Sequence, residues 1–305
     1  MSDSAKPESV AFKERVAVGL LKASASLPLA LSRAIGHLIG RVTFWMKGRM
    51  YSVTDENLSL CFPQMQADQR QRLVLESLIQ TSQMMMETGA VWLRDYDWVK
   101  QRILKVHDRH ILDDALAENR GVILLAPHLG NWEVLGLYLS EVAEVTSLYQ
   151  PPDMQTLEPI IRQSREKVGA KLVPTNRKGV MALLKAMKSG GFTAILPDQV
   201  PDAAGGEFAP FYGTPALTMT LVNNLRSRSD CRVIAAYAKR VKGGFEIQFK
   251  SADEGIGAET ESEALAALNR TVEACVNDIP AQYQWEYKRF RKQPEGYPKP
   301  YKKRR

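Results

Sequence analysis

Residues 121–133 read GVILLAPHLGNWE, and this stretch decides the fold. Its first part, GVILLA, is a continuous apolar run of strand length, as expected for a strand buried on both faces. A turn containing a histidine and a glycine follows, and a helical pattern begins near Asn131. Ligands of parallel sheets bind at the carboxyl ends of the strands, so we expect the functional site directly after GVILLA.

Strand-like and helix-like segments alternate from this stretch towards the C-terminus. The alternation predicts βαβ units, and therefore an α/β fold with a mostly parallel central sheet flanked by helices. The last two strands are predicted to form an antiparallel hairpin around residues 242–244. The predicted strands are 121–126, 145–149, 192–196, 232–239 and 244–249, and the predicted helices are 67–93, 131–140, 155–168, 178–189, 216–228 and 260–277.

The chain of 305 residues shows no internal repeat and no long linker, which favours one main domain over residues 51–290. Residues 1–50 are predicted to form an N-terminal helical segment. Its run 16–46 is apolar but is broken by charges and by Pro28, so it is too interrupted to span a membrane. Two interpretations remain open: an amphipathic segment lying in the membrane interface, or helices packed on the core of the domain.

The charge distribution points to an anionic surface as a partner. The formal net charge is +7, and nine Lys or Arg with one acid occur between residues 288 and 305. Residues 291–305 are predicted to form a basic tail, either simply solvated or attracted to anionic lipid. We favour a membrane surface over nucleic acid. The three cysteines are scattered, and this indicates neither a disulfide framework nor a metal cluster but a reducing compartment.

His128 and Glu133 are the candidate catalytic residues. Their H-x4-E spacing would allow the carboxylate to orient one imidazole nitrogen while the other acts as a general base. The alternative is a histidine bonded only to local backbone. The sequence has four histidines and contains no zinc-protease motif, nucleophile-elbow serine, Walker A loop or dinucleotide fingerprint. This pattern predicts activation of a substrate hydroxyl without a metal.

Several blocks of sequence resemble one known family. APHLGNWE resembles the H-x4-D/E motif of the lysophospholipid acyltransferase superfamily, and within it the bacterial lipid A biosynthesis (lauroyl or myristoyl) acyltransferases. The stretches NLSLCFP at 57–63, ILPDQ at 195–199, FAPFYGTPA at 208–216 and QYQWEYKRFRKQP at 282–294 are similar to further blocks of that family in the same order. The resemblance covers nearly the whole chain.

The resemblance implies roles for individual residues. His128 would be the general base and Glu133 its orienting carboxylate, while Arg165 falls where the family has a functional arginine. Asp198 would organise the pocket or bind Arg165, unless it is a simple turn or capping residue. The residues expected to bind substrate are Asn131, Arg165, Asp198, Gln199, Phe211, Tyr212 and Gly213.

The resemblance also implies a reaction. An acyl chain would move from acyl-acyl carrier protein to a hydroxyl of a glycolipid, the lipid A precursor, with neither a cofactor nor a metal. The enzyme would be peripheral or monotopic at the cytoplasmic face of the bacterial inner membrane. Two alternatives stay open: an acyltransferase for another lysolipid, such as a lysophospholipid or aminolipid, and a non-catalytic membrane protein that only binds lipid.

Overall fold

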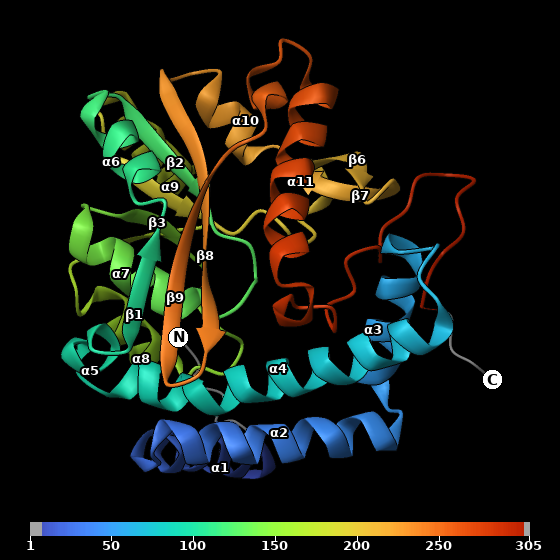
Figure 1. Cartoon of the computed structure of the whole chain (residues 1–305). Helices are drawn as coiled ribbons and strands as arrows, with labels where there is room; N and C mark the ends of the chain where they lie inside the picture. Colours follow the sequence, from blue (N-terminus) through green and yellow to red (C-terminus); the bar gives the residue numbers. More distant parts are fainter. Residues whose placement is uncertain (1–7, 302–305) are drawn as a thin grey trace.

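The computed structural model describes residues 8–301, so the last four cations of the predicted basic tail lie outside the described residues. Five strands form the central sheet in the order β1 (Ile103–His107), β9 (Gly244–Ser251), β8 (Cys231–Val241), β2 (Gly121–Leu125) and β5 (Phe192–Ile195). Neighbours are parallel except for β8 and β9, which form an antiparallel hairpin. The mostly parallel sheet and this hairpin confirm the sequence prediction (Figure 1).

Strand β2 is central because both of its faces are apolar. Val122 and Leu124 pack on one side with α5 (Tyr96–Lys100), α6 (His110–Ala117) and α7 (Trp132–Val142). Ile123 and Leu125 pack on the other side with α9 (Arg177–Lys188), α10 (Leu221–Arg226) and α11 (Glu261–Asp278). All five residues of β2 are buried. Because helices cover both faces of the strand, its carboxyl end lies between two layers of helices.

A small parallel pair, β3 (Thr146–Tyr149) and β4 (Lys171–Pro174), lies beside β5 through a bridge between Val145 and Phe192. Helix α8 (Glu158–Glu166) connects these two strands. Short 3-10 turns occur at Ala203–Gly205, Glu254–Gly257 and Pro280–Gln282.

The predicted helix 216–228 is partly wrong. Its first residues belong to a hairpin of β6 (Gly206–Phe211) and β7 (Thr214–Met219), and only α10 is helical. Tyr212 and Gly213 form the turn of this hairpin with φ of 48° and 75°. A two-residue hairpin loop of type I′ has positive φ at both positions, and glycine adopts it without steric cost. The turn chemistry of Gly213 thus overrides the helical pattern downstream.

The N-terminal segment forms α1 (Glu8–Ser26) and α2 (Leu29–Met46), followed by α3 (Arg49–Cys61) and the long α4 (Ala67–Leu93). Helix α2 runs along α4 in very close contact (Figure 1). A Cβ atom on Gly36 would lie 2.6 Å from the Gln83 Cα atom, and one on Gly40 would lie 2.4 Å from the Ile79 Cα atom. One face of the segment therefore packs on the domain, as one of the two interpretations expected.

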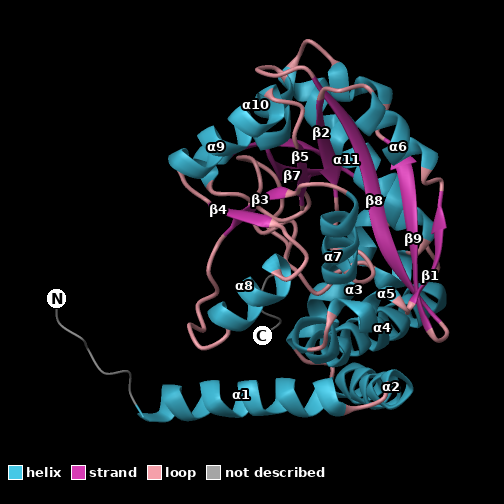
Figure 2. Ribbon diagram, turned by 90° about the vertical axis from the view of Figure 1, so that its left-hand side faces the viewer, coloured by secondary structure: helices cyan, strands magenta, loops and turns pink. Residues whose placement is uncertain are grey.

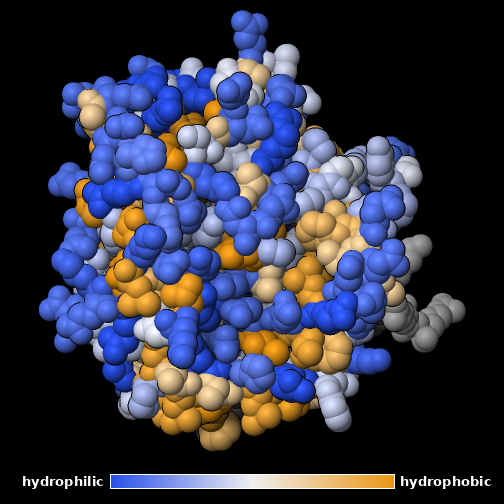
Figure 3. Space-filling model, viewed as in Figure 1, coloured by the Kyte–Doolittle hydropathy of each residue, from blue (hydrophilic) through white to orange (hydrophobic). Residues whose placement is uncertain are grey.

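The opposite face of α1 and α2 is apolar and exposed. Figure 3 shows apolar side chains gathered over these helices. The exposed residues are Phe12, Val16, Leu20, Leu31, Leu38, Ile39, Val42, Trp45 and Met46, which we call the apolar face. None of the helices within residues 8–301 has both the length and the apolar composition needed to cross a membrane.

The C-terminal segment folds back onto the domain. Arg289 and Phe290 are buried, and Arg289 donates hydrogen bonds to the Leu217 carbonyl and the Thr218 hydroxyl. The Tyr301 hydroxyl donates to the Asn57 side chain. The described part of this basic segment thus holds at least one cation that is structural rather than solvated.

Candidate active site

The turn after β2 is held against β8 by Gly130. Its φ is +64°, and a Cβ atom there would lie 2.0 Å from the Ala238 carbonyl oxygen. Only glycine fits both the backbone conformation and the space. The Asn131 amide donates to the same carbonyl at 2.8 Å, which fixes the path of the chain between His128 and α7.

His128 pairs with Asp198, which follows β5. The Nδ1 atom of His128 lies 2.9 Å from Asp198 Oδ1, and the His128 amide donates to Oδ2 at 2.9 Å. Parallel pairing of β2 and β5 brings both strand ends to the same edge of the sheet, and this explains the contact. The carboxylate that orients the imidazole is therefore that of Asp198, and not that of Glu133 as the H-x4-E spacing predicted.

This geometry leaves the second imidazole nitrogen available. Burial alone would raise the pKa of Asp198, but the imidazole of His128 and its hydrogen bonds hold that pKa below its ordinary value. When the imidazole is neutral, an ionised Asp198 favours the tautomer with the proton on Nδ1, and Nε2 then carries the lone pair. No residue in the described part of the chain hydrogen-bonds to Nε2. An imidazole in this state can accept a proton from a hydroxyl.

Glu133 instead pairs with Arg165. The guanidinium donates through two nitrogens to the two carboxylate oxygens, at 3.2 and 2.5 Å. The Glu133 side chain is 7% exposed and that of Arg165 36% exposed, so the pair lies at a pocket mouth rather than in open solvent. Burial opposes the charge of Arg165, but Glu133 raises the pKa of Arg165 above its ordinary value. The expected contact between Asp198 and Arg165 is replaced by this one.

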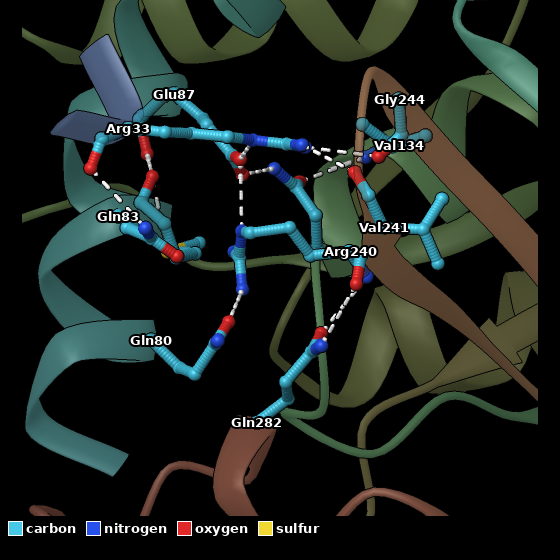
Figure 4. Close-up of polar contacts among 12 residues, drawn as sticks. Arg33, Gln80, Gln83, Glu87, Val134, Arg240, Val241, Gly244 and Gln282 are labelled. Carbon is cyan, nitrogen blue, oxygen red and sulfur yellow. Dashed lines mark hydrogen bonds and ion pairs between the residues drawn. The ribbon is translucent and has the colours of Figure 1, made fainter. Parts of the chain in front are cut away.

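Asn131 has a structural environment rather than a free binding surface. Its Oδ1 atom accepts from the Val134 amide and caps α7, while its Nδ2 atom donates to Glu87. Glu87 is fully buried and also accepts from Arg33 of α2 and Arg240 of β8 (Figure 4). Both polar ends of the Asn131 side chain are thus engaged within the protein, contrary to its predicted role in substrate binding.

Two pockets meet at Trp132, whose indole ring lies edge-on to the His128 imidazole with 4.9 Å between centroids. The pocket beside α4, which we call the α4 pocket, has a volume of about 320 Å³ and is lined by both hydrogen-bonding and apolar residues: Arg49, Met50, Gln80, Thr81, Met84, Met85, Gly130, Trp132, Gln282, Gln284 and Glu286. The apolar pocket has a volume of about 90 Å³ and lies between α7 and the strands β3, β4 and β5, with Glu133 and Arg165 among its lining residues.

The α4 pocket offers several hydrogen-bonding side chains among its methionines and Trp132. Burial raises the pKa of Glu286, although the Thr81 hydroxyl donates to this carboxylate at 3.1 Å. Gln199 donates to Gln284, a lining residue, at 3.1 Å, so the predicted Gln199 lies one contact behind the pocket wall. Side-chain amides and a carboxylate suit a ligand rich in hydroxyl groups.

Phe211, Tyr212 and Gly213 line neither pocket. Phe211 is buried in the core, and Tyr212 packs on Phe62 while its amide donates to Glu273. A Cβ atom on Gly213 would meet no atom within 4 Å, so the turn conformation rather than a close approach requires this glycine. The block that contains them stabilises the hairpin β6–β7 and its contact with α11.

Sequence reasoning missed Trp132, Glu87 and Glu286 as parts of the site. Trp132 lies inside the quoted motif, so its position beside His128 could have singled it out. Glu87 gave a signal too, since it is a lone acid in the apolar run MMMETGAVWL. Glu286 belongs to a C-terminal stretch whose distance from the motif in sequence hid its proximity in space. Within the described chain, no group of three or more His, Cys, Asp or Glu gathers where it could hold a metal ion.

The mostly parallel α/β sheet and the histidine paired with a buried carboxylate are compatible with an acyltransferase, and similarity to known proteins shows that class. The model of the bacterial lipid A biosynthesis acyltransferase family matches residues 8–292, and the chain belongs to this family. It therefore acts in acyl transfer for lipid A biosynthesis.

Named relatives span nearly the same length. The chain is 26% identical over 285 residues to the lipid A biosynthesis palmitoleoyltransferase of Escherichia coli K12, which covers 92% of this chain and 91% of that protein. It is 23% identical over 290 residues to the lauroyltransferase of the same strain, covering 93% of each chain. It is 23% identical over 255 residues to the myristoyltransferase, covering 81% of this chain and 77% of that one.

Proposed function

We propose that this enzyme transfers an acyl chain from acyl-acyl carrier protein to a hydroxyl of a lipid A precursor, with His128 as the general base. The observation that carries the proposal is the pairing of His128 Nδ1 with buried Asp198, which leaves Nε2 free beside Trp132. His128 lines neither pocket but packs on Trp132, which lines both, so an acceptor from one pocket and a donor from the other can approach the same base.

The reaction needs one proton to move twice. The acceptor hydroxyl gives its proton to Nε2 of His128 while its oxygen forms a bond to the thioester carbonyl carbon. The carbon–sulfur bond then breaks, the ester product forms, and the imidazolium returns the proton to the departing thiolate. Asp198 stabilises the imidazolium between these two transfers, because its carboxylate lies 2.9 Å from Nδ1.

The two pockets suit the two substrates. The apolar pocket, walled by side chains such as Leu135, Leu148 and Leu172, has room at about 90 Å³ for only the first few carbons of a hydrocarbon chain. The α4 pocket carries Gln80, Gln284 and Glu286, which can bond sugar hydroxyls. Trp132 belongs to both walls, so a hydroxyl and a thioester carbonyl held in these pockets would meet next to the imidazole.

The apolar face of α1 and α2 supports a peripheral or monotopic position at the cytoplasmic face of the inner membrane. Unpartnered Leu38, Val42 and Trp45 supply apolar area, and Lys22 and Arg41 are exposed cations within the same helices. Apolar insertion combined with attraction to anionic lipid is how interfacial helices bind membranes. A bilayer-resident acceptor would then diffuse to a site that is already at the surface.

The test is acyl transfer by purified H128A and H128Q with acyl-acyl carrier protein and vesicle-borne acceptor. General-base catalysis contributes about 10²–10⁴ in rate, so both variants should lose at least about 100-fold in kcat. Near wild-type transfer by H128A would overturn the mechanism. Mass spectrometry of lipids after deletion of the coding sequence identifies the acceptor: loss of one acyl chain from lipid A supports the proposal, whereas altered phospholipids or aminolipids with unchanged lipid A favour another lysolipid.

A further inference from the structure

Helix α7 carries a glycine in its interior, at position 136. Glycine weakens a helix interior relative to alanine, so its presence there needs a reason. Two structural reasons are common, namely a backbone with positive φ and a close approach by another part of the chain. Gly136 has neither, because its backbone is helical and a Cβ atom added to it would meet no atom within 4 Å.

Glycines in the other α-helices between residues 8 and 301 show the contrast. A Cβ atom on most of them would lie only 1.8–2.6 Å from an atom outside the helix, as is the case for Gly36, Gly40, Gly89 and Gly179. Gly19, on the exposed side of α1, is open like Gly136, but it lines neither of the two pockets at Trp132. Packing therefore explains the other glycines of the helical core and leaves Gly136 to be explained by the pocket that it lines.

The open space beside Gly136 is the apolar pocket. Trp132, Gly136 and Ser140 all line it, and their spacing of four residues puts them on one face of α7. Leu148 of β3 and Leu172 of β4 line it from across the pocket. Figure 2 shows β3, β4 and α8 together on one side of α7, with β8 and β9 on the other. A side chain at position 136 would therefore project into the pocket.

The position of Gly136 along the pocket connects it to the reaction. Trp132 lies against the His128 ring, so the end of the pocket nearest the reacting groups is at Trp132. At the rise of an α-helix, Gly136 lies about 6 Å and Ser140 about 12 Å further along α7. A volume of about 90 Å³ spread over this length is a narrow passage. An acyl chain that starts at His128 and follows α7 must pass Gly136 within its first few carbons.

We propose that Gly136 is the residue that determines which acyl chains the enzyme accepts from its donor, because its missing side chain lets the hydrocarbon pass between α7 and the strands β3 and β4. The inference rests on the proposed function, which places the donor chain in this pocket. The chemistry of the wall fits hydrocarbon. Its two charged residues, Glu133 and Arg165, neutralise each other, and the hydroxyls of Ser140 and Ser147 donate to backbone carbonyls.

The test compares G136A and G136L with wild type, and G19L is the matched control. Gly19 is also a helical glycine with no atom near its added Cβ, so the control makes the same change outside both pockets. The donors are butyryl- and lauroyl-acyl carrier protein, with one detergent-dispersed acceptor so that membrane binding has no influence. The readout is the ratio of kcat/KM for lauroyl over butyryl transfer. A loss of folded enzyme would lower both values equally and leave this ratio unchanged.

G136L should lower this ratio about tenfold or more, because a butyryl chain ends before position 136 and each methylene of lauroyl that loses its apolar contact costs about a factor of four. G136A should lower the ratio by less, and G19L should keep the wild-type ratio. The unfolding temperature of G136A should equal or exceed that of wild type, because alanine favours the helix and its methyl group meets no atom.

Three results would overturn the role of Gly136 alone: an unchanged ratio in G136L, an equal fall of the ratio in G19L, or a rise in KM for the acceptor with the donor ratio unaltered. The last of these would place a chain of the acceptor in the apolar pocket. A wild-type enzyme that transferred neither acyl chain from carrier protein would overturn the proposed function instead.

Discussion

Asp198 Oδ1 lies 2.9 Å from His128 Nδ1, while the carboxylate of Glu133, five residues after His128, is bound to Arg165. The two carboxylates of the site thus have separate tasks. Asp198 is positioned to fix the imidazole tautomer, and Glu133 with Arg165 forms part of the apolar pocket wall.

Asp198→Asn should lower kcat by at least about 100-fold while the protein stays folded, since an amide cannot stabilise the imidazolium and can hold the wrong tautomer. The measurement is steady-state transfer, with circular dichroism to verify folding. Asp202→Asn, at an exposed position four residues later, is the matched control and should retain full activity. Equal activity in the two variants would show that Asp198 has no part in orienting the base.

Stability should depend on pH through Asp198. Its pKa in the folded protein is depressed, because His128 and hydrogen bonds outweigh the effect of burial. A depressed carboxyl pKa contributes stability that is present above the ordinary value of about 4 and is lost as pH falls through the folded value. Urea unfolding should therefore show wild type more stable than Asp198→Asn at neutral pH, with the difference shrinking below about pH 4. A difference that stays constant down to acid pH would contradict this coupling.

Glu133 and Arg165 should be strongly coupled in a double-mutant cycle. Removing either partner leaves a poorly solvated charge, so Glu133→Gln and Arg165→Met should each destabilise the fold by about 1–2 kcal/mol, discounted because the guanidinium is 36% exposed. The double variant should be less destabilised than the sum of the two, as measured by urea unfolding. Strict additivity would mean that the bidentate contact contributes nothing.

Residues 121–133 and Asp198 show which parts of the site can be predicted from the sequence. The run GVILLA, the turn glycine and the acid of the first helical turn are local features, and they correctly predicted β2, the turn and α7. The partner of His128 is 70 residues away, and only the parallel register of β2 and β5 brings Asp198 to it. A spacing rule could not choose between two acids, because strand pairing decides which one faces the imidazole.

In the segment 208–216, residues predicted to bind substrate have structural roles instead. Phe211 and Tyr212 were predicted to line the pocket, yet Phe211 is a core residue and Tyr212 a turn residue. Sequence blocks in the right order identify a family, but they do not separate residues that touch substrate from residues that hold the fold. Burial and turn geometry make that distinction, and both are properties of the folded chain.

Glu87 joins three parts of the protein, since it accepts hydrogen bonds from Asn131, Arg33 and Arg240 (Figure 4). Glu87→Gln should destabilise the fold by about 3 kcal/mol, because it leaves buried guanidinium groups without a counter-charge. Thermal and urea unfolding give the value. Glu76→Gln, at an exposed position of the same helix, should change stability by less than about 0.5 kcal/mol. Similar stabilities for the two variants would show that the buried network is energetically neutral.

Removing α1 and α2 altogether would be a poor test of membrane binding, because α2 packs on α4 through Gly36 and Gly40. A deletion would remove that packing together with the apolar face. Substitutions on the exposed side separate the two roles, since they leave the contact with α4 intact.

Leu38→Glu combined with Val42→Glu should therefore abolish sedimentation with anionic vesicles at low and high salt, because both side chains belong to the apolar face and a charge there opposes insertion. Transfer to a vesicle-borne acceptor should fall in parallel, while transfer to a detergent-dispersed acceptor and the unfolding midpoint should stay near wild type. Leu104→Glu, which alters an exposed leucine of β1, is the control and should bind vesicles normally. Undiminished sedimentation of the double variant would mean that α1 and α2 serve only to pack on α4. The salt dependence of sedimentation then measures the electrostatic contribution to vesicle binding, because salt screens the attraction of basic residues to anionic lipid but does not weaken apolar insertion.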